Sequence, residues 1–316
     1  MTKIEWTDRT WNPVTGCDKV SPGCDHCYAE GIANRFAGTP QFPNGFGVTL
    51  RPERLAQPLR WRKPRRVFVN SMSDLFHDEV SIDYIAKVLA VIALTPQHTY
   101  QILTKRHARM RSIVTNRCHC TGGHLDGEHL RSAMAWAVSK ANPDRVPGMP
   151  DDAEQQVYFE AGWPLRNLWL GVSAEDQKWA DIRIPALMET PAAVRFLSAE
   201  PLLGPIDLHD TPLDWVIVGG ESGRGARPMH PDWARSLRDQ CEQLGVAYLF
   251  KQWGEWMPNG FWRRDTGRPA GNPREHAFET GGRNGFLPLM ARVGKKQAGR
   301  ELDGRTWDEF PKVVPL

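Results

Sequence analysis

One pattern repeats along most of this chain and restricts its fold more than any other feature. A short apolar run rich in β-branched residues is followed by polar residues or glycine, and then by an amphipathic stretch. Uninterrupted apolar runs are typical of strands that are covered on both faces, as in parallel sheets. The runs lie at residues 66–70, 99–103, 167–172, 193–197, 214–218 and 246–250.

Helix signals lie between these runs. Ser81 is placed as the N-cap of a helix over residues 81–94. A helix over 231–244 begins with Pro231 and is followed by Gly245, which are the residues preferred at these two ends. Shorter helical stretches are expected at residues 29–36, 108–114 and 180–189.

The alternation of strand and helix predicts an α/β fold built from βαβ units. With a further strand-like piece at residues 11–15, we expect a partial or complete βα barrel, of the TIM type, with about 6–8 parallel strands. The barrel occupies residues 1–257 and is interrupted by an insertion at about 116–163, rich in Gly, Pro, His and charge. Residues 258–316 form an irregular, basic C-terminal extension, which we expect to pack on the barrel.

Composition excludes several classes of protein. Apolar residues make up 41% and charged residues 24% of the 316, as in a globular chain with a sizeable core. The longest apolar stretch, residues 84–94, is too short to span a bilayer, so we expect no membrane segment. The first residues carry acids and lack the apolar core of a secretory signal, which favours a cytoplasmic protein.

Three cysteines lie close together, at Cys17, Cys24 and Cys27. Six cysteines in all are too few for a disulfide scaffold, so this grouping indicates a metal site. Three thiolates without a neighbouring fourth leave an open coordination position, as in a [4Fe-4S] cluster with one free iron. Two alternatives remain: a zinc ion completed by His26 or a remote ligand, and cysteines that bind nothing.

Polar residues follow each predicted strand, at the end where a barrel places its active site. Any one of them has an alternative role as an ordinary helix cap. A backbone with two successive glycines, Gly219 and Gly220, is able to approach a ligand closely, with Glu221 as an acceptor. In chain order, the polar and glycine positions are Ser71, Ser73, Asp74, Thr104, Lys105, Ser173, Glu175, Glu200, Gly219, Gly220, Glu221 and Lys251.

Two basic segments and one further cluster complete the candidates. The net charge of +3 is too small to indicate nucleic acid, but Arg51–Arg66 and Lys105–Arg111 are locally basic. They suit phosphate contacts, with Trp61 able to stack a base, or else they form a solvated face. The insertion offers a second set of metal-ligand residues for zinc or a second cluster: Cys118, Cys120, His124 and His129.

The three-cysteine loop after a first strand, with Tyr28 beside the last cysteine, resembles the radical S-adenosylmethionine enzymes. Their usual first gap is three residues, and here it is six. More specifically, the chain resembles the phage-type three-Cys-motif proteins, a phage and bacterial family of unknown function. The matching segments cover nearly the whole chain outside the insertion: 3–8, 11–13, 23–29, 70–76, 103–105, 198–204, 218–223, 251–254, 294–296 and 302–304.

This resemblance implies a [4Fe-4S] cluster on the three cysteines, S-adenosylmethionine on the open iron, and an electron donor. Reductive cleavage of the cofactor would produce a 5′-deoxyadenosyl radical. The resemblance assigns Ser71, Ser73 and Asp74 to the methionine end of the cofactor, and Ser173 and Glu175 to its ribose. We add Thr104, Lys105, Glu200, Gly219 and Gly220 to the cofactor-binding set, and we assign Glu221 and Lys251 to catalysis. Nucleic acid is the favoured substrate; the alternative is a non-enzymatic, zinc-bearing phage protein that binds nucleic acid or a partner.

Overall fold

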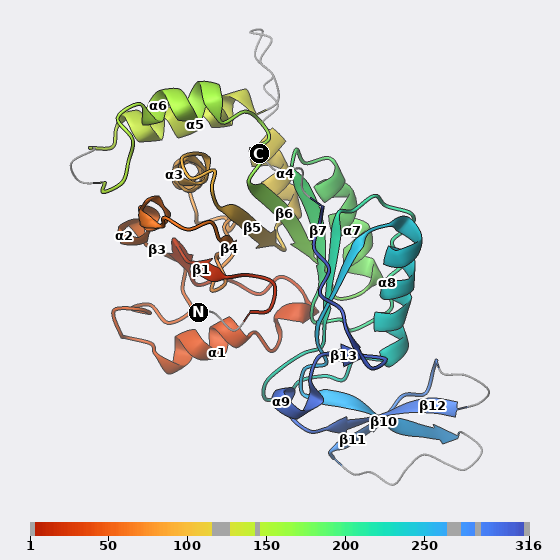
Figure 1. Ribbon diagram of the computed structural model, residues 1–316. Coiled ribbons are helices and arrows are strands. Elements are labelled where there is room, and N and C mark those ends of the chain that lie inside the picture. Colours follow the sequence, from red (N-terminus) through yellow and green to blue (C-terminus); the bar gives the residue numbers. More distant parts are fainter. Residues whose placement is uncertain (1–3, 116–126, 143–145, 264–272, 282–285, 313–316) are drawn as a thin grey trace.

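A computed structural model of the chain describes residues 4–115, 127–142, 146–263, 273–281 and 286–312. Its centre is one sheet of seven parallel strands in the order β1-β4-β5-β6-β7-β8-β9 (Figure 1). The edge strands β1 and β9 are not paired with each other, so the barrel is partial. The predicted α/β fold is confirmed. The seven strands are β1 (Arg9–Trp11), β4 (Arg66–Val69), β5 (Thr99–Thr104), β6 (Leu168–Ser173), β7 (Val194–Ala199), β8 (Trp215–Gly219) and β9 (Ala247–Gln252).

Helices cover one face of this sheet. Ser81 caps α3 by accepting a hydrogen bond from the Tyr84 amide at 3.3 Å, as its position in the sequence predicts. Gly245 ends α8 in the left-handed conformation that favours glycine. The principal helices are α1 (Tyr28–Arg35), α3 (Ile82–Ala93), α4 (His107–Thr115), α7 (Gln177–Met188) and α8 (Pro231–Leu244), and a short α2 (Pro52–Leu55) precedes β4.

The other face of the sheet is filled by aromatic rings instead of helices. Trp6 packs on Phe68 with ring centroids 4.5 Å apart and on the edge of Trp215 at 6.1 Å. Phe310, from the far end of the chain, lies 5.1 Å from Trp215 on the same face. Segments from both ends of the chain therefore close the inside of the partial barrel, and the loops after the strands remain to build a site.

The insertion and the C-terminal extension contain regular structure of their own. The insertion holds α5 (Glu128–Ser139), α6 (Ala153–Gln155) and a π-helical turn (Gln156–Glu160), and α5 packs on α3. The extension was expected to be irregular but contains a three-stranded antiparallel sheet in the order β10-β12-β11. Its exposed positions hide the strand periodicity. Its elements are β10 (Trp256–Arg263), β11 (Glu275–Ala277), β12 (Phe286–Arg292), α9 (Lys295–Ala298), β13 (Glu301–Leu302) and β14 (Arg305–Thr306).

The residues that follow β14 run along the free edge of β9. The Phe250 amide donates to the Trp307 carbonyl at 3.0 Å, and the Glu309 amide donates to the Tyr248 carbonyl at 3.2 Å. This pairing covers an edge that would otherwise be open to other strands. None of the helices in the described ranges is long and apolar enough to cross a bilayer.

Candidate functional site

The cysteine loop leaves a short strand, β2 (Val14–Thr15), which pairs with β3 (Thr49–Leu50). Gly16 forms a parallel bridge with Ser73, in the loop after β4. Its φ is +88°, and a Cβ at this position would lie 2.2 Å from the carbonyl oxygen of Gly47, so only glycine fits. The beginning of the cysteine loop is thereby fixed at the carboxyl end of the sheet.

The other two cysteines lie at local helical features. Cys24 ends a 3-10 turn over Pro22–Cys24, and its amide donates to the Ser21 carbonyl at 2.8 Å. Cys27 is the N-cap of α1 but makes no side-chain capping bond, so its thiol is available for another partner. All three thiols are free and half-buried.

A buried ion pair supports the middle of the loop. The Gly23 amide donates to Glu175 Oε1 at 3.0 Å, and Glu175 Oε2 lies 3.1 Å from Arg183 Nη1. Both charged side chains are inaccessible to solvent. Glu175, expected at a ribose, is engaged in holding the cysteine loop above β6.

Arg227 holds the loop from the side of β8. Its guanidinium makes two bonds to Glu221, at 2.9 and 2.6 Å, and also reaches the Pro22 carbonyl at 2.8 Å and Asp25 at 3.2 Å. The hydrogen bonds with Glu221 raise the pKa of Arg227 further. The ring of His26, the alternative zinc ligand, faces Gly225 of the same β8 loop. The Glu221 carboxylate is therefore occupied by Arg227.

Cys17 lies between an acid and a base from the loops after β4 and β5. Arg106 Nη1 donates to Cys17 Sγ at 3.4 Å and lies 3.8 Å from Asp74. Burial raises the pKa of the Cys17 thiol to about 11; Asp74 adds to the rise and Arg106 opposes it. Asp74 is itself saturated, because it accepts from the Thr104 hydroxyl at 2.7 Å and the Lys105 amide at 3.0 Å. Asp74 and Thr104 thus stabilise the loops in place of facing a cofactor.

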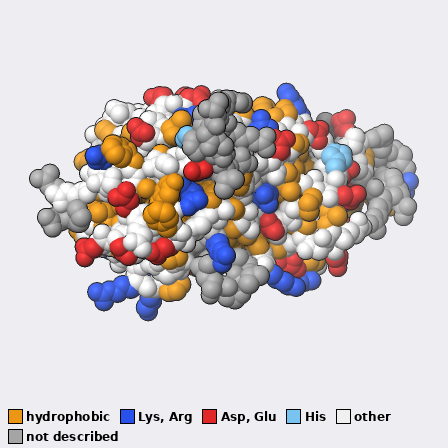
Figure 2. Space-filling view, turned by 90° about the horizontal axis from the view of Figure 1, so that it is seen from above, with side chains coloured by type: hydrophobic (Ala, Val, Ile, Leu, Met, Phe, Trp, Pro, Cys, Tyr) orange, Lys and Arg blue, Asp and Glu red, His pale blue; other side chains and the backbone are white. Residues whose placement is uncertain are grey.

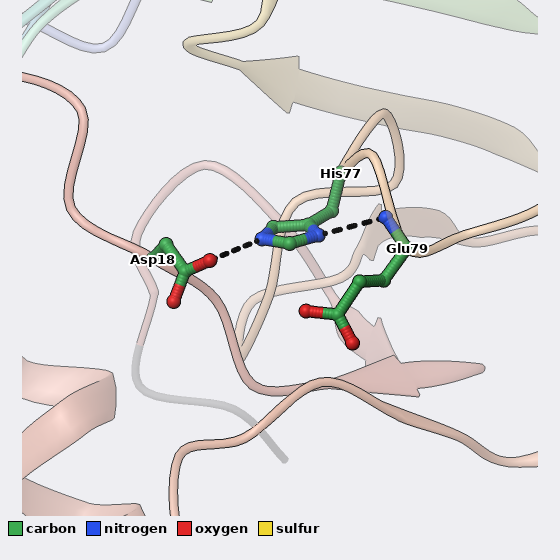
Figure 3. Close-up of side chains that lie close together, drawn as sticks. All are labelled: Asp18, His77 and Glu79. Atoms are coloured by element: carbon green, nitrogen blue, oxygen red, sulfur yellow. Dashed lines mark hydrogen bonds and ion pairs between the residues drawn. The ribbon is translucent and has the colours of Figure 1, made fainter.

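A second group of metal-ligand side chains lies beside the loop: Asp18, His77 and Glu79 (Figure 3). His77 Nδ1 accepts a hydrogen bond from the Glu79 amide at 3.2 Å, so a neutral ring carries its proton on Nε2. That proton points to Asp18 at 3.0 Å, where a metal would need a lone pair. The group therefore fits a latch that ties the residue after Cys17 to the β4 loop, and not a metal site.

The spacing of the thiols distinguishes between kinds of metal centre. Among the described residues, Asp18, His77 and Glu79 are the one group whose ligand atoms all lie within 4.8 Å of one another, and the three thiols do not meet that limit. Three thiolates on one zinc, with Zn–S bonds of about 2.3 Å, bring their sulfurs within about 4 Å of one another. In a [4Fe-4S] cluster each thiolate binds a different iron, which keeps the sulfurs farther apart. The three thiols as placed are therefore not gathered around a single zinc position.

Other predicted side chains lie at the mouth of the sheet, which is the opening formed by the loops at the carboxyl ends of its strands. Lys105 Nζ donates to the Ser173 hydroxyl at 2.5 Å, and Lys251 Nζ lies 2.6 Å from Glu200. The Ser71 and Ser73 hydroxyls donate to groups before and in β2: Asn12 Oδ1 at 3.2 Å and the Val14 carbonyl at 2.8 Å.

The two glycines at the end of β8, Gly219 and Gly220, serve chain packing. A Cβ on Gly220 would lie 2.0 Å from the Trp253 carbonyl oxygen, and one on Gly219 would lie 3.2 Å from the Glu200 carboxyl carbon. Neighbouring residues of the chain already occupy these spaces.

The basic segments divide between the two ends of the sheet. Arg51 is buried and bonded to Thr15 Oγ1 at 3.2 Å, while the exposed Arg60, Arg62 and Lys63 precede β4 and so lie at the edge opposite the cysteines. In the segment after β5, Arg106 serves Cys17, Arg109 bonds the Val80 carbonyl at 2.8 Å, and Arg111 pairs with Glu189 at 2.6 Å. Figure 2 shows Lys and Arg interspersed with acidic and apolar side chains on the face it colours.

Of the insertion's ligand set, Cys118, Cys120 and His124 lie outside the described residues, and His129 lies in α5.

Sequence reasoning missed Arg183, Arg227 and His77, and it placed Arg106 only in a basic segment suited to phosphate contacts; all four help to hold the cysteine loop in place. One signal was present for Arg183: it occupies a buried position of α7 among Ala180, Ile184 and Leu187, where an arginine needs a partner. No comparable pattern marks Arg227: Glu221 lies six positions before it, but its contacts in the cysteine loop, Asp25 and Pro22, lie 202 and 205 positions before it.

Comparison with known proteins identifies the family. A family model described as "Protein of unknown function (DUF5131)" matches residues 1–311, so the chain belongs to that family. A family of unknown function was the expectation from the sequence, and this part of the expectation is confirmed. A search of curated proteins finds no match.

Three solved structures are similar to this chain, at low TM-scores and low sequence identity. A spore photoproduct lyase variant with bound AdoMet and dinucleoside spore photoproduct has 11% identity and a TM-score of 0.39, with 90% of this chain and 68% of that one covered. A second variant of that lyase has 11% identity, a TM-score of 0.39 and coverages of 92% and 72%. The lyase complexed with dinucleoside spore photoproduct has 12% identity, a TM-score of 0.36 and coverages of 88% and 67%.

Proposed function

We propose that this member of the DUF5131 family is a radical S-adenosylmethionine enzyme with a [4Fe-4S] cluster on Cys17, Cys24 and Cys27. One observation carries the proposal: the cysteine loop lies at the carboxyl end of a parallel sheet and is held there from four strand loops. The contacts come from Ser73 and His77 after β4, Arg106 after β5, Glu175 after β6 and Arg227 after β8. A loop fixed from so many sides suits a preorganised reactive centre.

The three thiols are not gathered around a single zinc position, which speaks against the alternative of a zinc-bearing binding protein. Arg106 adds a further fit, because an N–H donor beside a ligating sulfur stabilises its negative charge. Three cysteine ligands leave one iron open for a small molecule. When bound, the cluster supplies one electron for reductive cleavage of S-adenosylmethionine to methionine and a 5′-deoxyadenosyl radical.

The chain's own groups would bind and orient the cofactor. Lys105 is a half-buried cation that donates to a neutral hydroxyl, that of Ser173, and a free ammonium of this kind suits a carboxylate ligand. The Glu200–Lys251 pair offers both charges at the ends of β7 and β9, and Ser71 offers a hydroxyl after β4. We propose these four for cofactor or substrate contacts, and a positioning role for Glu221 in place of catalysis.

Nucleic acid is the substrate class that we propose. Two basic residues at the carboxyl end of the sheet support it. Lys105 and Arg106 lie beside the cysteine loop, where a phosphate would be near the reactive centre. The exposed cations Arg60, Arg62 and Lys63 give no such support, because they lie at the far edge.

The test measures iron, sulfide and zinc after anaerobic purification and reconstitution. Wild type is compared with the Cys17→Ala/Cys24→Ala/Cys27→Ala variant and with Cys241→Ala, a control at a buried cysteine in α8. We expect about four irons per chain in wild type and control and none in the triple variant. 5′-Deoxyadenosine should form only with cluster, S-adenosylmethionine and reductant present. One zinc per chain without cofactor cleavage would refute the proposal.

A further inference from the structure

A cavity in the insertion is lined by aromatic and acidic side chains. It lies between α5, α6 and the π-helical turn that follows α6, and its volume is about 840 Å³. Figure 1 shows α5 and α6 together at the margin of the molecule, beyond α3. This volume is in the range of small-molecule sites. The lining residues that matter for its chemistry are Trp136, Asp152, Glu154, Tyr158 and Phe159.

Two of the aromatic rings are more exposed than any other large apolar side chain in the described part of the chain. Trp136 is 64% exposed and Phe159 is 73% exposed. Rings left in water contribute little hydrophobic stabilisation, so packing does not account for their position. The third ring, Tyr158, lies 4.8 Å from Phe159 and edge-on to it, within the π-helical turn. Such turns are rare and occur frequently at functional sites.

Cations of the chain itself already lie against two of the rings. Lys140 Nζ is 4.1 Å from the centre of the Trp136 ring, and the guanidinium carbon of Arg131 is 5.2 Å from the centre of the Tyr158 ring. The face of an aromatic ring is electron-rich and attracts positive charge. Among the described residues, no cation lies over Phe159. The rings of this cavity therefore attract cations, and Phe159 is available for a further one.

The charged side chains that line the cavity are both acidic. Glu154 is exposed and makes no hydrogen bond or ion pair with any residue in the described ranges. Asp152 accepts from the neutral Gln156 amide at 2.7 Å, so its negative charge is not neutralised. No lysine or arginine is among the described lining residues. The carboxylates repel phosphate groups, which argues against a nucleic-acid strand, and they attract the same charge as the rings do.

We propose that this cavity binds an organic cation with a methylated ammonium head. Such a head presents its charge through methyl groups and suits aromatic faces, whereas the ammonium of lysine is strongly hydrated. A free quaternary amine and a trimethylated lysine side chain share this chemistry. None of the contacts described above between the strand loops and the cysteine loop comes from the insertion, whose α5 packs on α3. The inference thus goes beyond the proposed function and does not depend on a cluster.

The test is a proton NMR titration of choline with the whole chain. The control ligand is the neutral analogue of choline, in which a carbon atom replaces the charged nitrogen and the shape is kept. We expect the analogue to bind about tenfold more weakly than choline. Phe159→Leu and Glu154→Gln should each weaken choline binding by about fivefold, because one removes a ring face and the other a carboxylate. Phe261→Leu, at a ring that is 62% exposed on β10, should leave it unchanged.

Two peptides distinguish the sources of the cation: one carries trimethyllysine and the other unmodified lysine at the same position. Tighter binding of the modified peptide than of choline would assign the site to a protein partner, and the reverse order would assign it to a free amine. Equal binding of choline and its neutral analogue would overturn the inference, and so would equal binding of the two peptides.

The variants and the oligomeric state offer further ways to refute the inference. Choline binding that neither Phe159→Leu nor Glu154→Gln weakens would place the cation elsewhere. A wild-type dimer that Phe159→Leu dissociates would assign the exposed rings to a second copy of the chain. None of these measurements needs iron, so their failure leaves the proposed cluster untouched, and a chain that takes up no iron leaves this site untouched.

Discussion

Arg227 and Glu221 form a two-point ion pair, with Nη2 and Nε of the arginine 2.6 and 2.9 Å from the two carboxylate oxygens. Glu221 is buried at the end of β8, and the same guanidinium reaches the Pro22 carbonyl in the cysteine loop. A buried carboxylate thus aims an arginine across the mouth of the sheet. Because β1 and β9 do not pair, this contact joins parts of the mouth that the sheet leaves separate.

Replacing Arg227 with alanine should loosen the cysteine loop without unfolding the chain. Residues that orient metal ligands typically change metal retention by about 10-fold or more when removed. We expect iron to be lost to a chelator about tenfold faster than in wild type, with an unchanged circular dichroism spectrum. Arg224→Ala, at an exposed position of the same loop, is the control. Equal rates of iron loss in the two variants would contradict a positioning role for Arg227.

Removing one partner of the buried pair below Gly23 should destabilise the chain strongly. Glu175→Gln keeps the shape of the side chain but leaves Arg183 charged, buried and unpaired. Loss of one partner of such a pair costs about 3–5 kcal/mol of unfolding free energy. Urea unfolding measures the change, and Glu189→Gln, in the exposed pair with Arg111, should cost less than about 1 kcal/mol. Similar losses of unfolding free energy in both variants would show that breaking the buried pair costs no more than breaking the exposed one.

The strand and helix pattern was readable from the sequence because it depends on local periodicity. Ser81, Pro231 and Gly245 marked helix ends correctly for the same reason. The roles of Glu175 and Glu221 were not readable, because each depends on a partner supplied by the fold. Gly23 lies 152 positions before Glu175, and no local pattern encodes that contact.

The cysteines themselves were found by spacing, since all three lie within one short loop. The strands of the C-terminal extension were missed because their residues show no clear local pattern. In β10 only two of eight residues are buried, so the sequence alternates weakly, and the pairing with β12 shifts register between Pro258 and Phe261. A bulged, half-exposed sheet carries little signal of period two.

Two glycines with similar φ separate the cost of backbone strain from the cost of a clash. Gly16 has φ +88° and no room for a Cβ, whereas Gly38 has φ +81° and open space around it. Gly38→Ala should cost about 1 kcal/mol from the left-handed backbone alone. Gly16→Ala should cost more, because the Gly47 carbonyl must move, and it should also displace Cys17. Thermal unfolding of both variants checks this, and equal losses would mean that the chain at Gly47 yields freely.

The N-cap of α8 should make stability depend on pH. His230 Nδ1 accepts from the Asp232 amide at 3.0 Å, and the opposite ring nitrogen lies 3.0 Å from the Thr280 carbonyl, an arrangement that requires the neutral ring. Burial lowers the pKa of His230; Asp232 opposes the shift and Arg235 adds to it. The unfolded chain therefore binds a proton first, so this contribution to stability is complete above about pH 6.5 and is lost as the pH falls toward the lower folded pKa. His230→Asn keeps a capping side chain without the titration. Urea unfolding between pH 5 and 8, about the range in which histidine titrates, should show a smaller decline in the variant, and parallel curves would exclude His230 as the cause.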